Sequence, residues 1–178
     1  MRNPLLGLLL AVLLMPDSPL HAQTPSDAQS LANPAPRPKA ARGPSLTVAL
    51  DMAQAAIAAC AEKGDAISVT IADSAGDAKV TLAADNSGGR SSTSLRKAAS
   101  AAIFKASGTE IAAREKADPA FAAKIAAAPT VYSDHPGSLP LRVGTQVIGG
   151  IGVAGAPSHE RDAACAQAAI DKYGAVLK

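Results

Sequence analysis

The chain of 178 residues contains no tryptophan, two tyrosines and two phenylalanines, so aromatic residues make up only 2% of it. Ligand pockets are usually lined by aromatic and apolar side chains, so this scarcity counts against a rich aromatic pocket. Charge of one sign is also lacking, because 17 Lys and Arg face 15 Asp and Glu, a formal net charge of +2. A nucleic-acid-binding protein usually carries a strong basic stripe, so we do not expect that class.

Residues that perform chemistry are few as well, with three histidines, two cysteines and three methionines. The sequence has no HExxH motif, no nucleophile elbow and no paired CxxC motif. His159 and Cys165 are too far apart at the start of one predicted helix to form a catalytic dyad. No acid–base or nucleophile constellation is recognisable, so a non-enzymatic role is favoured over catalysis.

The first residues have the pattern of a secretory signal peptide. Arg2 supplies a basic start, 5–15 is an unbroken apolar run, and Leu20-His21-Ala22 is a small-residue cleavage site. The run is too short to cross a bilayer comfortably, although an uncleaved anchor is the alternative. We therefore predict a signal peptide at 1–22, no membrane span after cleavage, and a periplasmic or secreted protein.

The next segment, 23–44, is rich in Pro, Ala, Ser and Gln and has almost no large apolar residues. Such a composition cannot bury enough surface to order itself, so it predicts a flexible linker. Residues 45–178 then have a length suited to one domain.

Export changes how the two cysteines are interpreted. Cys60 and Cys165 lie far apart in the sequence, on predicted helices. In an oxidising compartment they are candidates for one disulfide. Two buried free thiols are the alternative, because cysteine is a good small core residue.

Hydrophobic periodicity predicts helices over 47–63, 92–107, 109–117 and 119–127, and a last helix that begins at Pro157-Ser158. In the first helix the expected buried stripe is Leu50, Ala53, Ile57, Cys60 and Ala61, and in the last it includes Cys165, Ala168, Ala169 and Val176. Thr109 and Asp118 are the expected N-caps of the two short helices, and Arg96, Lys97 and Lys105 are expected on the polar face of the second helix. Gly108 is expected to end that helix.

Alternation of apolar and polar residues predicts strands around Ile67–Ala72 and Val80–Leu82, joined as a hairpin by the turn 73–77. A short strand is expected at Thr130–Tyr132, and a second hairpin at 139–142 and 147–153. The order of elements favours an α+β fold with an antiparallel sheet of about five strands flanked by helices.

Four glycines, at positions 149, 150, 152 and 155, interrupt the last predicted strand. Glycine weakens a strand, so the run indicates that a helix, another subunit or a flat ligand packs on its backbone. Residues 150–155 also match G-x-G-x-x-G literally. A dinucleotide site is not favoured, because only one helix and no further strand follows.

His135 lies in the loop SDHPGS, beside the conformationally fixed Pro136-Gly137. A loop histidine at a sheet edge is a candidate ligand for a metal or for haem iron through its neutral imidazole. An ordinary surface histidine is the alternative. His159, at a helix N-terminus, is expected to be a solvated first-turn residue.

Four segments together resemble the GlcG/HbpS-like family of small haem-binding proteins, a domain also seen at the C-terminus of PduO-type adenosyltransferases. They are LTVALDMAQAAIAAC, ISVTIADSAGDAKVTLAAD, RSSTSLRKAASAAIF and HPGSLPLRVGTQVIGGIGVAGAPSHERDAACAQAAI, which span nearly all of 46–177 in the family's order. The resemblance implies a profilin-like fold with the first and last helices on one face, which makes a Cys60–Cys165 bridge sterically reasonable. It also implies a homo-oligomer, with haem, corrinoid or iron bound near subunit contacts in some members.

If haem binds, an iron ligand and cations for the propionates are needed. His135 is the first choice of ligand, with Tyr132 next, and Arg90, Arg96 and Lys97 are candidate propionate partners through charge-assisted hydrogen bonds. A solvated helix face is the alternative for these cations.

The resemblance favours an exported protein that binds haem or a related tetrapyrrole, as a sensor, scavenger or accessory factor. The alternative is a cofactor-free accessory or assembly subunit of a periplasmic enzyme system, with a periplasmic protein partner.

Overall fold

The computed structural model describes residues 41–178. Its helices are α2 (Leu46–Ala61), α3 (Ser91–Phe104), α4 (Gly108–Ala117), α5 (Pro119–Ala126), α6 (His159–Tyr173) and the short 3-10 helix η1 (Gly174–Val176). Its strands are β1 (Ser68–Asp73), β2 (Ala78–Ala83), β3 (Ser138–Val143) and β4 (Gln146–Ala154). The predicted signal peptide, 1–22, and most of the predicted linker, 23–44, lie outside the described residues and stay predictions.

The strands of the described residues form one four-stranded antiparallel sheet in the order β2-β1-β4-β3. The predicted α+β class and both hairpins are confirmed. The prediction of a fifth strand at Thr130–Tyr132 is wrong. The N–H groups of Val131 and Tyr132 both donate to the carbonyl of Ala128, in a turn after α5. Ile151 pairs with Ile71 and Leu139 on antiparallel neighbours, so β4 is not the first strand of a dinucleotide-binding βαβ unit.

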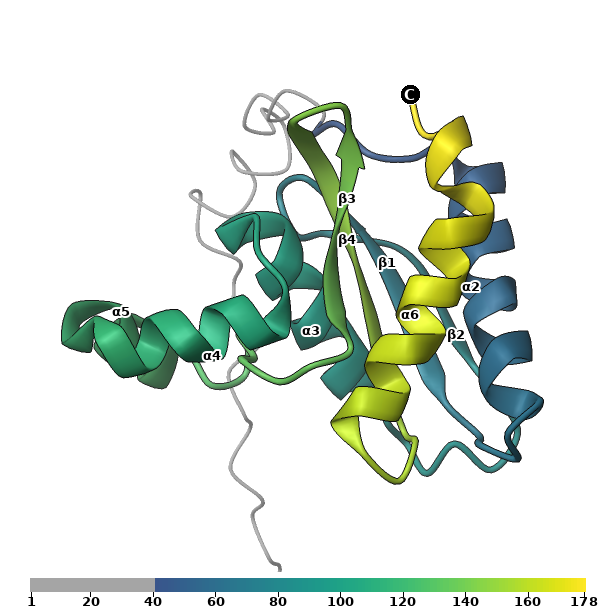
Figure 1. Ribbon diagram of the computed structural model, residues 1–178, viewed down its shortest axis with the longest axis horizontal. Coiled ribbons are helices and arrows are strands. Elements are labelled where there is room, and N and C mark those ends of the chain that lie inside the picture. Colours follow the sequence, from purple (N-terminus) through teal and green to yellow (C-terminus); the bar gives the residue numbers. More distant parts are fainter. Residues whose placement is uncertain (1–40) are drawn as a thin grey trace, which may run out of the picture. The chain divides into compact units, whose positions relative to one another are not determined.

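Helices cover both faces of the sheet (Figure 1), with α2 and α6 side by side on one face and α3 on the other. The main core lies under α2 and α6, where the apolar side chains of β1 and β4 meet many alanines. Because alanine offers little area to bury, these helices must lie close to the sheet and to each other to exclude water. No helix within 41–178 is long and apolar enough to cross a bilayer.

The buried face of α2 differs from the predicted stripe. Leu50 is 38% exposed, whereas Ala49, Met52, Ala53, Ala56 and Cys60 are fully buried. The helix turns its small residues inward because α6 and the sheet approach closely, and large side chains would hold them apart. The prediction for Val176 is also wrong: α6 ends at Tyr173 and Val176 lies in η1, so it does not continue the buried face of α6. It is exposed, and its neighbour Leu177 is buried instead.

Glycines in β4 let the backbone of α3 rest directly on the strand. A Cβ at Gly150 would collide with the carbonyl oxygen of Ala98, and a Cβ at Gly152 with the carbonyl oxygen of Ser94 and the amide of Ala98. The sequence left a helix, another subunit or a flat ligand as what packs on this backbone, and the structure shows a helix of the same chain, α3.

We expect Gly152→Ala to lower the free energy of unfolding by about 1–3 kcal/mol or more, because the added methyl group forces α3 away from β4. Gly174→Ala is the matched control, since a Cβ there meets its nearest neighbour at 3.5 Å, an ordinary contact. Urea unfolding followed by circular dichroism measures both variants. Equal midpoints for the two would contradict this account of β4.

The short helices α4 and α5 lie away from α2 and α6 (Figure 1) and have their own small core. The N-cap of α4 is Ser107, not Thr109, and it forms a capping box with Glu110. The helix before it ends at Lys105, in the left-handed conformation, rather than at Gly108. The predicted cap of α5 is confirmed, because the Asp118 carboxylate accepts from the amides of Ala120 and Phe121.

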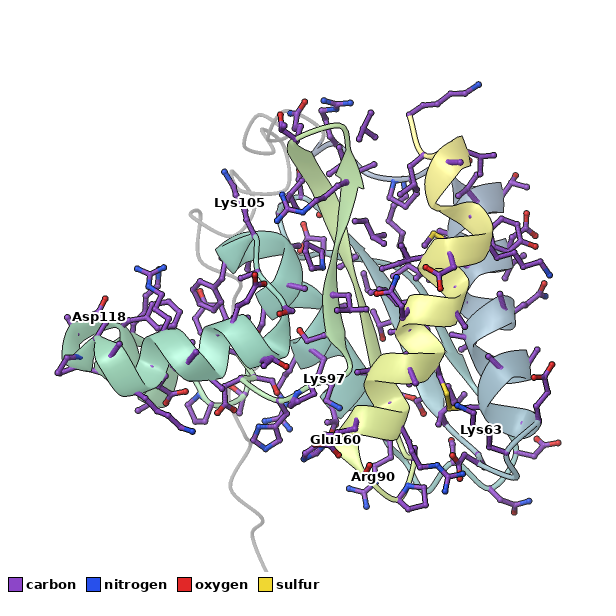
Figure 2. All side chains as sticks on the ribbon, viewed as in Figure 1. Lys63, Arg90, Lys97, Lys105, Asp118 and Glu160 are labelled. Carbon is purple, nitrogen blue, oxygen red and sulfur yellow. A yellow bond between two sulfur atoms is a disulfide. The ribbon has the colours of Figure 1, made fainter. Side chains whose placement is uncertain are left out.

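A disulfide joins Cys60 of α2 to Cys165 of α6 across 105 residues of sequence, and Figure 2 shows its yellow bond between the two helices. Both cysteines are buried at this contact.

The two ends of the described domain lie together. The amide of Ser74 donates to the carbonyl of Arg42 at 2.7 Å, and Pro44 is fully buried, so the last residues before α2 pack on the domain. Residues 43–45 and 175–178, with Val48 and Lys79, line one cavity of about 670 Å³.

Candidate functional site

The loop 133–138, which carries His135, is held by α3 and β4. At its start the amide of Ser133 donates to Ser100 Oγ of α3 at 2.8 Å, and near its end Gly137 accepts from the amide of Val153 at 2.7 Å. The loop is therefore fixed at both sides of the histidine, at the end of β4 that leads into α6.

His135 is oriented by its neighbour in the sequence. Its Nδ1 lies 2.6 Å from Asp134 Oδ1, and its side chain is 52% exposed. A carboxylate beside Nδ1 orients the ring and favours a proton on Nδ1 over one on Nε2, so in the neutral imidazole Nε2 is the donor atom. A metal ion binds the neutral imidazole through that atom.

His159, the first residue of α6, lies against His135. The two ring centres are 4.6 Å apart and the ring planes are inclined by 51°. His159 Nδ1 is 3.8 Å from Asp162 Oδ2, and its side chain is 51% exposed. His159 is thus a solvated first-turn residue, as expected, and in addition its ring pairs with a second imidazole.

Lys97 is the most marked departure from the sequence prediction. Its side chain is fully buried, and its Nζ donates to Asp162 Oδ2 and to the carbonyl of Val153, both at 2.8 Å. The prediction that Lys97 lies on the solvated polar face of α3 is thus wrong. Burial lowers the pKa of Lys97, and the Asp162 carboxylate opposes that effect through its hydrogen bond and charge.

Asp162 holds the start of α6 together. Besides Lys97, it accepts a hydrogen bond from the amide of Ala156 at 3.0 Å, so one carboxylate joins α3, the loop before α6 and α6 itself. Ser158, the predicted helix start, is the N-cap and accepts from the amide of Arg161. These contacts position His159 beside the loop of His135.

A cavity of about 300 Å³ opens beside this first turn of α6. Figure 2 shows Arg90, Lys97 and Glu160 gathered there. The lining consists of Arg90, Thr93, Lys97, residues 154–160 and Asp162. His135 adjoins this cavity through His159 and does not line it, so the cavity contributes an exposed cation, Arg90, next to the histidine pair.

Two predicted site residues lie elsewhere. Arg96 donates to the carbonyl of Pro129 at 2.6 Å and lines a different small cavity with Leu95 and Val131. Tyr132 packs its ring 4.8 Å from that of Phe104, in the small core of α4 and α5. These positions do not favour Arg96 as a propionate partner or Tyr132 as an iron ligand next to His135.

The surroundings of the histidine pair are mainly acidic. Glu115 of α4 lies near Asp134, and one of its carboxylate oxygens is buried without a hydrogen-bond partner. Burial first, and then the neighbouring Asp134, raise the pKa of Glu115. Within 41–178 no three His, Cys, Asp or Glu side chains are grouped so as to hold a metal ion by themselves. The described part of the site thus brings two imidazoles together without a third grouped ligand of these types.

Sequence reasoning singled out His135 as a candidate but did not identify the residues that lie beside it. No local signal pairs His135 with His159, or Lys97 with Asp162, because each pair is brought together only when α6 packs beside the end of β4. The one available signal was the lysine in a helix otherwise rich in small residues, since a long cation there needs a buried acid.

Comparison with known proteins places the chain among related folds. The model of the family described as "Haem degrading protein HbpS-like" matches residues 45–171. No curated protein matches significantly.

Solved structures agree with this match. A double mutant of Streptomyces reticuli HbpS is 33% identical, with a TM-score of 0.61, covering 82% of this chain and 99% of that one. A crystal structure of HbpS is 29% identical, with a TM-score of 0.68, covering 79% and 96%. PduOC, crystallised as a complex with haem, is 24% identical, with a TM-score of 0.64, covering 71% and 92%; at this identity the likeness concerns the fold alone.

Proposed function

The chain belongs to the HbpS-like family, and from this we propose that it binds haem, with His135 as the iron ligand. The observation that carries the proposal is the family match over residues 45–171, whose description names haem. The complex of PduOC with haem is consistent with it, although that likeness extends only to the fold.

His135 has the features that an iron ligand needs. Asp134 lies on its Nδ1 at 2.6 Å, and half of its side chain is accessible, so Nε2 is available to iron. The bound haem would supply an iron centre for ligand or electron chemistry. The chain's own part is to hold the imidazole in one tautomer and to present it at the surface.

Arg90 is the cation best placed for a propionate, because it lines the cavity next to His159 and is exposed. Lys97 is committed to Asp162, so we do not assign it a propionate. A cavity of about 300 Å³ is at the lower limit of ligand pockets and is too small to enclose a porphyrin by itself. We therefore propose that a second copy of the chain covers the remaining porphyrin surface, in a homo-oligomer.

The N-terminal pattern supports export, so we propose that haem is bound in the periplasm or outside the cell, where the protein acts as a sensor, scavenger or accessory factor. A disulfide between buried cysteines fits an oxidising compartment.

We expect the purified protein to shift the Soret band of haemin, with saturation at a fixed stoichiometry, and His135→Ala to weaken this binding at least tenfold. Tyr132→Phe is the matched control and should bind like the wild type, because its ring packs on Phe104. Light scattering of the same samples gives the oligomeric state.

An unshifted Soret band would sink the haem proposal and favour the cofactor-free accessory subunit as the function. A full shift with His135→Ala would remove His135 as the ligand while leaving haem binding in place.

A further inference from the structure

The spacing of the His135 and His159 rings also fits two imidazoles that bind one metal ion. If two imidazoles bind one metal ion at about 2.0–2.1 Å, each ring centre lies about 3.2 Å from the metal. Ligand angles of about 90–110°, from tetragonal to tetrahedral, then place the two ring centres about 4.5–5.2 Å apart. The observed separation of 4.6 Å falls inside this range, so the spacing of the two rings is compatible with one shared ion.

His135 has the outer contact of a metal-binding histidine, because Asp134 lies 2.6 Å from its Nδ1. His159 has a carboxylate nearby but not hydrogen-bonded to it, since Asp162 Oδ2 is 3.8 Å from its Nδ1 and accepts from Lys97 instead. Carboxylates in this position orient the ring and make Nε2 a better donor. The loop 133–138 supplies this contact for His135, and the first turn of α6 places a second carboxylate within 4 Å of His159.

The charges around the pair also favour a cation. Asp134 and Glu115 lie near His135, and Glu160 and Asp162 lie near His159. The opposing cations are Lys97, which Asp162 neutralises at 2.8 Å, and Arg90 across the cavity. The balance of these six groups is negative, which lowers the cost of bringing a divalent ion to the imidazoles.

We propose that His135 and His159 together bind one divalent transition-metal ion, with Asp134 as the outer-sphere carboxylate of His135. The ion keeps open positions, because no third protein ligand is grouped with the pair within 41–178. Imidazole donors select ions such as Cu²⁺, Ni²⁺ and Zn²⁺ over Mg²⁺ and Ca²⁺, and Cu²⁺ binds most tightly in the series. This inference does not depend on haem binding, since both rings are used and no porphyrin is needed.

The test is a titration of the full-length protein, without an affinity tag, with Cu²⁺ in the absence of haem. We expect one equivalent to bind, with nitrogen hyperfine structure from two imidazoles in the electron paramagnetic resonance spectrum. His135→Gln and His159→Gln should each weaken binding at least tenfold and leave a spectrum with one imidazole or none. Asp134→Asn should weaken it about 10- to 100-fold, as outer-sphere variants do.

The control is Asp171→Asn, an exposed carboxylate about three turns along α6 from His159, which should leave the affinity unchanged. Undiminished binding in His159→Gln, or no tight binding by the wild type, would overturn the paired site. Haemin titration of His159→Gln separates the two proposals: it should retain the Soret shift, so loss of Cu²⁺ alone bears on the pair and loss of haemin alone on the proposed function.

Discussion

Replacement of Lys97 by methionine should lower the free energy of unfolding by about 3–5 kcal/mol, the usual cost of removing one partner from a buried ion pair. Methionine fills a similar volume, so the loss comes from the Asp162 carboxylate, which stays 97% buried at its side chain without its counter-ion. The amide of Ala156 still donates to it, but one neutral donor does not replace an ammonium group. Urea unfolding at neutral pH measures the effect.

The double variant Lys97→Met with Asp162→Leu is the informative control. Burial is the largest influence on the pKa of Lys97, which means that desolvation outweighs the attraction of Asp162. Replacing both charges should therefore recover most of the stability lost in the single variant. If the single variant is as stable as the wild type, the ion pair does not hold α3 to α6 in the way described.

The same shift gives a dependence on pH. Because the pKa of Lys97 is lowered in the folded state, the folded protein releases this proton at a lower pH than the unfolded chain does. Stability contributed by this group then rises as the pH increases through the lowered pKa. The stability difference between the wild type and Lys97→Met should thus widen in alkaline buffer.

Removing the disulfide with Cys60→Ala and Cys165→Ala together should cost about 4–5 kcal/mol. The bridge closes a loop of 105 residues, so it restricts the unfolded chain strongly in the loop-entropy account. Unfolding of the wild type in dithiothreitol, once the bond is reduced, should shift toward the midpoint of the double variant. The variant itself should not respond to the reductant.

A wild-type midpoint that is unchanged by complete reduction would contradict a stabilising role for this bond. In that case the close packing of α2 on α6 would carry the stability of this face by itself, as the fully buried Ala53, Ala56 and Ala169 would allow.

The general fold could be predicted from local patterns. Alternation at Ile67, Val69 and Ile71 gave a strand, and the glycines of β4 correctly indicated that something lies on the backbone there. Thr130–Tyr132 failed because β-prone residues are also used in turns when an aromatic side chain has a core to enter. The ring of Tyr132 packs into the small core of α4 and α5.

The buried face of α2 and the buried charged pair were harder to predict from the sequence. A hydrophobic stripe ranks Leu50 above Ala49, but close helix packing reverses that order. Lys97 was expected in solvent because lysine is rarely buried without a partner, and its partner Asp162 lies 65 residues later. Contacts between distant residues of this kind carry no periodic signal in one sequence.

The meeting of residues 43–45 with residues 175–178 at one cavity has an evolutionary consequence. A domain whose two ends lie close together can be inserted into a surface loop of another protein without straining either connection. It can equally well be reconnected by a short bridge and opened at another turn, such as Gly144, with the sheet and its covering helices preserved.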